Sequence, residues 1–96
     1  MSVDLLTKHA QVLICVARDP NMRLRDIAEC VGVTERSTQQ LVFELEEGGY
    51  LTRRRAGRRN VYEVHPEATL PHSLEGDASV ADLLAALDAK PGAAVE

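Results

Sequence analysis

Apolar residues recur at helical spacing in the first third of the chain. From Asp4 to Arg18 they predict a mostly buried helix, with a central stripe of Leu6, Ala10, Leu13 and Ala17 that is widened by Val12, Ile14 and Val16. Pro20 ends this helix, because a proline disfavours helical geometry in the residue before it. A second helix is predicted from Arg23 to Val31. Gly32 follows it, where a residue that easily adopts a left-handed conformation is favoured.

A third helix is predicted from about Glu35 to Glu47, and Gly48-Gly49 ends it. Thr34 precedes this helix, where its hydroxyl would accept a hydrogen bond from the free amides of the first turn. The inward face is expected to consist of Thr38, Leu41, Val42 and Leu45. The opposite face is polar apart from one aromatic residue, and it carries Arg36, Gln40, Phe43 and Glu47, flanked by Glu35, Ser37 and Gln39.

Alternating residue types predict two strands after the double glycine, from Tyr50 to Arg55 and from Asn60 to His65. The residues expected to point inward are Leu51, Tyr62 and Val64. Ala56 to Arg59 form the connecting turn, and a tighter turn around Gly57 also fits the sequence. The predicted fold is therefore mainly α with a β-hairpin (α+β).

After Pro66 the helix and strand patterns give way to a connector, which is followed by one more predicted helix. Ser79-Val80-Ala81-Asp82 has the spacing of a capping box, and the helix is predicted to run to about Ala89. Its apolar stripe consists of Val80, Leu83, Leu84 and Leu87. This stripe either folds back on the first helix or pairs with the same helix of a second chain, and Phe43 is a further candidate for that contact. We therefore divide the chain into residues 1–65 and a connector with a C-terminal helix at residues 66–96.

Charge is unevenly distributed, although the formal net charge is only −4. From Tyr50 to His65 five arginines stand against one acid, whereas from Pro66 onward one lysine stands against six acids. Salt limits the reach of such charges to roughly 10 Å, so the local charge of the hairpin indicates its partner better than the total does. Arginines gathered on a hairpin repel one another, and bound phosphates would remove that penalty. An acidic protein, or the chain's own acidic tail, is the alternative partner.

Chain length, cysteines, apolar runs and histidines limit the classes of function that the sequence allows. Ninety-six residues suffice for one domain and its core but not for a separate ligand-binding module. Cys15 and Cys30 lie within apolar helical patterns, which favours buried reduced thiols; a redox or metal sensor built from them is the alternative. The absence of a signal peptide and of a long apolar run favours a cytoplasmic protein with no membrane partner. No catalytic, metal-binding or cofactor-binding constellation accompanies the scattered histidines, which are His9, His65 and His72.

Several residues fall at the spacings of a helix-turn-helix: Ile27, Ala28, Val31, Gly32, Val33 and Leu41. The run from Leu45 to Leu51 has the order of a junction between a recognition helix and a wing, and the run from Gly57 to Tyr62 that of the wing itself. In this ordered combination, the chain from about Leu5 to His65 resembles the small bacterial winged helix-turn-helix regulators of the MarR/ArsR type.

The resemblance implies that the third helix lies in the major groove of duplex DNA. Its first half would carry the contacts, from Thr34, Glu35, Arg36, Ser37, Gln39 and Gln40. Arg36 could pair with guanine and Gln40 with adenine, while Thr34 and Ser37 are better placed for phosphates.

The resemblance also implies that the wing tip enters the minor groove, through Arg58 and with Arg59 as a second candidate. The remaining arginines would then contact phosphates along the DNA backbone; they are Arg53, Arg54 and Arg55. Asn60 completes the predicted DNA-binding set. The expected protein is a sequence-specific double-stranded DNA-binding transcription regulator, acting as a homodimeric repressor without a cofactor or an identifiable effector. The alternative is a winged helix used as a protein–protein interaction module without DNA binding.

Overall fold

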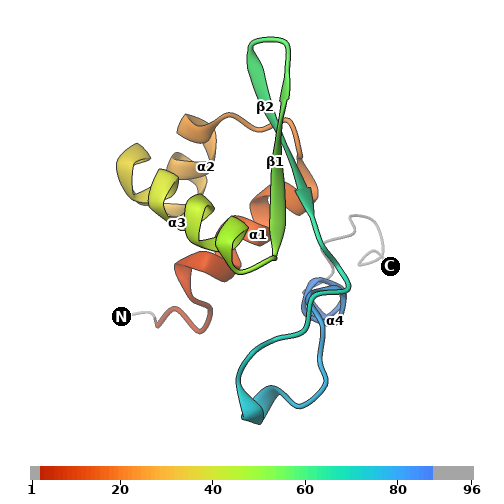
Figure 1. The fold of residues 1–96 in the computed structure, drawn as a ribbon. Coiled ribbons are helices and arrows are strands. Elements are labelled where there is room, and N and C mark those ends of the chain that lie inside the picture. The colour runs from red at the N-terminus through yellow and green to blue at the C-terminus, as the bar shows by residue number, and fades with distance from the viewer. Residues whose placement is uncertain (1–2, 88–96) are drawn as a thin grey trace, which may run out of the picture.

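Three helices, a hairpin and a shorter last helix follow one another in the computed structural model, which describes residues 3–87 (Figure 1). The elements are α1 (Lys8–Arg18), α2 (Leu24–Val31), α3 (Glu35–Glu47), β1 (Leu51–Ala56), β2 (Arg59–Val64), a short 3-10 helix η1 (Ser73–Glu75) and α4 (Val80–Ala86). The two strands are antiparallel neighbours. This architecture confirms the predicted α+β fold of a winged helix-turn-helix with a C-terminal helix.

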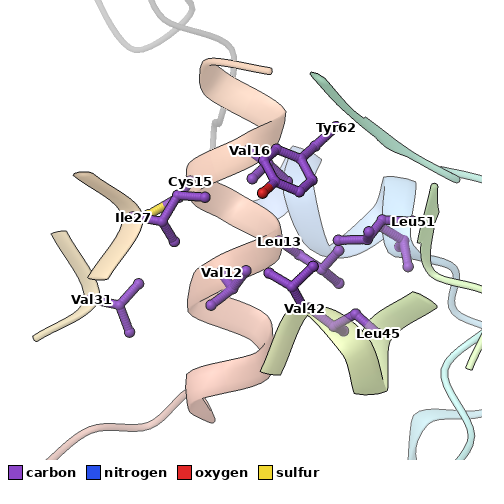
Figure 2. Close-up of a cluster of buried hydrophobic side chains, with 11 residues drawn as sticks. Val12, Leu13, Cys15, Val16, Ile27, Val31, Val42, Leu45, Leu51 and Tyr62 are labelled. Atoms are coloured by element: carbon purple, nitrogen blue, oxygen red, sulfur yellow. The ribbon is translucent and has the colours of Figure 1, made fainter. Parts of the chain in front are cut away.

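The core forms around α1. Figure 2 shows Ile27 and Val31 of α2 pointing toward α1 from one side, and Val42 and Leu45 of α3 from the other. Leu51 and Tyr62 close the core from the hairpin, each with 2% of its surface exposed. The inward residues predicted for α3 and the strands therefore point inward, and their burial holds α3 and the hairpin against one body.

The start of α1 differs from the prediction. The helix begins at Lys8 rather than Asp4, because the hydroxyl of Thr7 accepts a hydrogen bond from the backbone N–H of Ala10 at 3.1 Å and caps the first turn. Leu5, which lies outside the helix, is 91% exposed. A local cap thus overrides the apolar periodicity that favoured an earlier start.

The turn between α2 and α3 forms as predicted. Gly32 has φ +84° at the end of α2, and its N–H donates to the carbonyl of Ala28 at 2.8 Å. A residue with a left-handed backbone conformation at this position ends the helix and sets the direction of the next one. α2 begins at Leu24, since Arg23 is its extended cap residue, and the bounds of α3 are those predicted.

The strands are shifted by one residue from the predicted ones. Ala56 pairs with Arg59 at the end of the ladder, so the turn contains only Gly57 and Arg58. Gly57 has φ +67°, a conformation that a residue without Cβ adopts at little cost, and this permits the tighter of the two turns considered.

The segment after β2 returns to the body of the protein. The backbone N–H of Val80 donates to the carbonyl of Ala68 at 2.8 Å, and that of Leu70 donates to Ala78 at 2.9 Å. The predicted capping box is present, with Ser79 and Asp82 each accepting a hydrogen bond from the other's backbone N–H. The predicted end of this helix near Ala89 lies outside the described residues.

Val80 requires a correction to the predicted dimerisation stripe. Its side chain has no exposed surface and belongs to the core of the single chain, with Leu84 packed against that core. Val80 is therefore buried within its own chain, whereas Leu87 remains 38% exposed. Across residues 3–87, no helix has both the length and the apolar character needed to cross a membrane.

Candidate nucleic-acid interface

The first turn of α3 is held by its own side chains. The hydroxyl of Thr34 accepts a hydrogen bond from the N–H of Ser37 at 3.0 Å and donates to the Ser37 hydroxyl oxygen at 3.1 Å. Thr38 is fully buried and donates its hydroxyl to the carbonyl of Thr34 at 2.9 Å. The Thr34 hydroxyl therefore fixes the start of α3. The Ser37 hydroxyl faces outward, and its proton is free to donate a hydrogen bond.

The outward side of α3 is polar and uncovered. Arg36, Gln39 and Gln40 are all exposed, and the side chains of Arg36 and Gln39 form no hydrogen bond or ion pair within residues 3–87. Phe43 lies on the same side and is 52% exposed. These four side chains can meet a flat or grooved partner without any rearrangement of the core.

Gln40 takes part in a short polar chain. Its Nε2 donates to Oε2 of Glu44 at 2.9 Å, and the other carboxylate oxygen lies 2.6 Å from Nε2 of His9 on α1. The hydrogen bonds from Gln40 and from His9 hold the pKa of Glu44 below its ordinary value. Glu44 is thus charged at neutral pH and restrains a side chain that was predicted to read bases.

Four of the five arginines of the wing, the β1–β2 hairpin, divide between its two faces, and the fifth, Arg58, lies in the turn. Residues paired across an antiparallel ladder share a face. Arg53 and Arg55 pair with Tyr62 and Asn60, so they lie on the face that carries the buried Leu51. Arg54 lies on the opposite face with Arg59, because successive strand residues alternate. The side chains of the residues from 53 to 55, which are predicted to follow phosphates, therefore leave the strand on alternating faces, and their contact with phosphates stays a prediction.

Most of these guanidinium groups already have a partner. Arg54 Nη2 lies 3.0 Å from the Glu63 carboxylate across the hairpin, and Arg53 Nη2 lies 3.4 Å from that of Glu46 at the end of α3.

Two more arginines contact the backbone, since Arg55 Nε donates to the carbonyl of Gly57 at 3.4 Å and Arg59 donates to that of Asn21. Arg58, at the turn, is exposed and forms no polar side-chain contact in the described part of the chain. Arg58 is thus the wing-tip cation that is free to meet a partner.

The base of the wing is anchored by contacts between distant residues. The N–H of Tyr62 donates to the carbonyl of Pro20 at 3.0 Å, which ties β2 to the α1–α2 connection. Burial raises the pKa of Tyr62. Asn60, predicted to contact DNA, lies two residues before Tyr62 on the same strand and is only partly exposed.

His65 has a role that the sequence did not reveal. Its Nδ1 lies 2.9 Å from the carbonyl of Gly49, which can only accept, so Nδ1 carries the proton. The Nε2 atom of the neutral ring then accepts from the Thr52 hydroxyl at 2.7 Å. The ring thus joins the end of β2 to the α3–β1 junction. The only signal in the sequence was a histidine at the end of an alternating strand.

The wing and the outward face of α3 both remain uncovered by the C-terminal part of the described chain. Figure 1 shows the hairpin rising from the three-helix body, with its tip at the top of the view and α4 well below it. All five arginines of the wing are exposed, as are Glu35, Arg36, Ser37, Gln39 and Gln40 on α3. The acidic tail, in so far as it is described, does not cover the basic hairpin.

The two cysteines differ in accessibility, contrary to the prediction that both are buried. Cys15 lies in the core on α1, and Cys30 on α2 is exposed. Burial is the main cause that raises the pKa of Cys15 to about 12, and the nearby thiol of Cys30 adds to it. No group of three or more His, Cys, Asp or Glu residues arranged to hold a metal ion occurs within residues 3–87.

Comparison with known families identifies the region that contains this surface. Residues 5–55, just over half of the chain, match the family model described as the IclR helix-turn-helix domain. The match covers α1 to α3 and β1 up to Arg55. No curated protein matches the chain. IclR is a different family from MarR/ArsR, so the resemblance drawn from the sequence holds for the winged helix-turn-helix regulators as a class.

Proposed function

We propose that this chain, which belongs to the IclR helix-turn-helix domain family, binds its DNA site as a homodimer and represses transcription from it. The family is one of DNA-binding transcription regulators, and the remaining question is how these residues would serve that activity. The observation that carries the proposal is the uncovered polar face of α3 next to a wing whose tip arginine is free. We assign DNA binding to residues 1–65 and self-association to residues 66–96.

The outward face of α3 is proposed to read base edges in the major groove. Arg36 would donate two hydrogen bonds to guanine O6 and N7, and each such pair is worth about 1–3 kcal/mol of discrimination. Gln39 and Gln40 suit adenine, which offers a donor and an acceptor in the same groove. Phe43, beyond them on the same face, suits the methyl group of thymine, which is the one apolar group in the major groove.

The start of α3 is proposed to position the helix on the DNA backbone. Ser37 and the amides of the first turn suit a phosphate, because a helix N-terminus favours anions. Thr34 supports them indirectly, through its hydrogen bonds to Ser37. Glu35 lies in the same turn and would accept a hydrogen bond from a cytosine amino group rather than contact a phosphate.

The wing is proposed to add charge and minor-groove contact. Arg58 would enter the minor groove, where narrow A·T-rich stretches carry an enhanced negative potential. Arg53, Arg54 and Arg55 would approach phosphates, with Arg54 exchanging its exposed ion pair with Glu63 for a phosphate contact. An exposed pair of this kind is worth about 1 kcal/mol or less, so the exchange is inexpensive. Arg59 would contribute mainly by holding the shape of the wing, and Asn60 would add a polar contact to DNA.

Self-association is proposed to use the exposed part of the C-terminal stripe. Leu87 is the most exposed of its members and is the residue proposed to meet the second chain, whereas Val80 and Leu84 serve the core of the chain itself. Pairing two chains through this region would place two recognition helices about 34 Å apart, one turn of B-DNA. A palindromic or near-palindromic site follows from that symmetry.

Repression by occlusion is proposed because a dimer bound over a promoter would block polymerase without any further part.

The proposal is tested by selecting bound genomic fragments with the purified chain at moderate salt, followed by measurement of affinity against salt concentration. We expect specific fragments to be retained, and the logarithm of the association constant to fall linearly with the logarithm of salt concentration. If no duplex fragment is retained while an acidic protein is, the wing serves a protein–protein interaction module instead.

A further inference from the structure

A pocket with a volume of about 600 Å³ lies on the side of α3 that faces α1 and the C-terminal segment. Sites for small molecules usually fall in this size range. Its walls are largely apolar and come from α1, α3, the segment after β2 and α4, through Leu6, Leu13, Leu45, Leu70, Pro71 and Leu83. The proposed DNA contacts leave this pocket unused.

Polar groups gather around this apolar space. Glu44 reaches it from α3 and His9 from α1, while His72 and Glu75 reach it from the segment before α4. Glu75 accepts a hydrogen bond from the backbone N–H of His72 at 3.0 Å, which leaves its second carboxylate oxygen available. Two carboxylates thus line the pocket, against two imidazoles that are charged only when protonated and no lysine or arginine.

We propose that this pocket binds a small organic cation with an apolar body, such as an arylalkylamine, with the carboxylate of Glu44 as its ionic partner. The apolar walls bury the body of the ligand, and the carboxylates favour an ammonium over a neutral or anionic group. Glu44 is better suited than Glu75 because hydrogen bonds from Gln40 and His9 already hold it in position.

The position of Glu44 connects the pocket to DNA reading, and this part rests on the proposed function. The carboxylate that would meet the ammonium is the one that accepts from Gln40 Nε2 at 2.9 Å. An ammonium at Glu44 competes with Gln40 for that oxygen and frees the amide for a base. It also offsets a negative charge on the helix that approaches DNA. Both effects strengthen DNA binding.

The binding test compares three compounds that share one apolar body: 4-phenylbutylamine, 4-phenylbutanol and 4-phenylbutyrate. Each is titrated into the full chain at pH 8, where ordinary histidines are neutral, and binding is followed through backbone amide NMR signals. We expect shifts confined to residues around the pocket, with the amine bound about ten-fold more tightly than the carboxylate. Equal affinity for the three compounds, or shifts spread over the whole surface, would overturn the assignment.

Matched variants locate the ionic partner. Glu44→Gln should weaken amine binding about five-fold, the upper range for a partly exposed ion pair, and leave the alcohol unaffected. Glu47→Gln is the control, because Glu47 lies on the same helix but does not line the pocket. Both positions are exposed, so both variants keep the apolar core. A loss in Glu47→Gln equal to that in Glu44→Gln would contradict a specific ion pair.

A second copy of the chain is the competing occupant of the pocket. If the signals of the pocket residues shift with protein concentration in the absence of amine, and the amine reverses that shift, then the pocket is an interface and the ligand proposal fails. Signals that do not depend on protein concentration support a small-molecule site.

The regulatory part is tested separately with a genomic fragment selected by the wild-type chain. We expect the amine to tighten binding about two- to five-fold, and Gln40→Ala or Glu44→Gln to remove that effect. An amine that binds without changing DNA affinity refutes the link through Gln40 and leaves the pocket intact. A chain that binds the amine but retains no duplex fragment refutes the proposed function and leaves the pocket intact.

Discussion

Nη2 of Arg53 lies 3.4 Å from Oε1 of Glu46, so an ion pair joins the first strand of the wing to the last turn of the recognition helix. The neighbouring Arg54 is paired with Glu63 on the other face of the hairpin. The arginines of the wing are therefore not equivalent, and their contributions to DNA binding should differ according to the partner that each must leave.

Arg58→Ala should have the largest effect on salt dependence among single arginine variants. Its guanidinium has no polar partner in the described chain, so its full charge is available to phosphates or to the minor groove. We expect the salt slope to decrease by about one unit, the value for one lost phosphate contact. Arg54→Ala, which also frees Glu63, is the comparison; a larger slope change there than in Arg58→Ala would contradict this ranking. Filter binding at several salt concentrations measures both.

Arg36→Ala should relax base preference more than it weakens overall binding. Arg36 is exposed and free on the outward face of α3, where a bidentate contact to guanine is worth about 1–3 kcal/mol of discrimination. Competition among single-base variants of a selected fragment checks this. An equal loss on every sequence would assign Arg36 to phosphate contact instead.

Phe43 should sense the methyl group of thymine. It is 52% exposed beside Gln39 and Gln40, and an aromatic side chain in the major groove can contact the thymine C5-methyl. Replacing single thymines by deoxyuridine in a selected fragment should weaken binding of the wild type at one position per half-site and leave Phe43→Ala unaffected. If both proteins lose the same affinity, Phe43 does not make the contact.

Val80→Ala and Leu87→Ser should separate folding from self-association. Val80 is fully buried, so truncation removes apolar burial and leaves a cavity, at a cost of roughly 1–3 kcal/mol in the free energy of unfolding. Leu87 is 38% exposed, and its replacement should cost less than about 0.5 kcal/mol while weakening dimerisation. Urea denaturation and sedimentation measure the two effects. Unchanged sedimentation of Leu87→Ser would remove this residue from the dimer contact.

The two thiols should react at very different rates. Cys30 is exposed, whereas burial raises the pKa of Cys15 to about 12 and keeps it as an unreactive thiol. At pH 8, iodoacetamide should modify Cys30 alone, and Cys15 should react only in the unfolded chain. Since the folded-state pKa lies above the reference value of 9.0, stability from this group is present below pH 9 and is lost as the pH rises toward 12. Mass spectrometry of peptides measures the labelling; rapid labelling of Cys15 in the native chain would contradict its burial.

The sequence by itself determined the features that depend on neighbouring residues. The helix spacings, the left-handed turn at Gly32, the Thr34 cap and the Ser79 capping box each follow from residues within one or two turns, and all were predictable. The alternating pattern located both strands to within one residue. Charge along the chain pointed to the hairpin as the surface that meets a partner. These local rules suffice for the fold class because secondary structure and apolar periodicity are short-range properties.

Only the tertiary structure decided which of these side chains are free. Arg59 contacts the carbonyl of Asn21, 38 residues away, while Arg58 beside it has no polar partner among the described residues. Val80 is buried in its own chain, Cys30 is exposed, and His65 fastens the junction between the recognition helix and the wing. Spacing along the sequence cannot distinguish such cases, because burial and pairing depend on segments that meet only when the chain packs around α1.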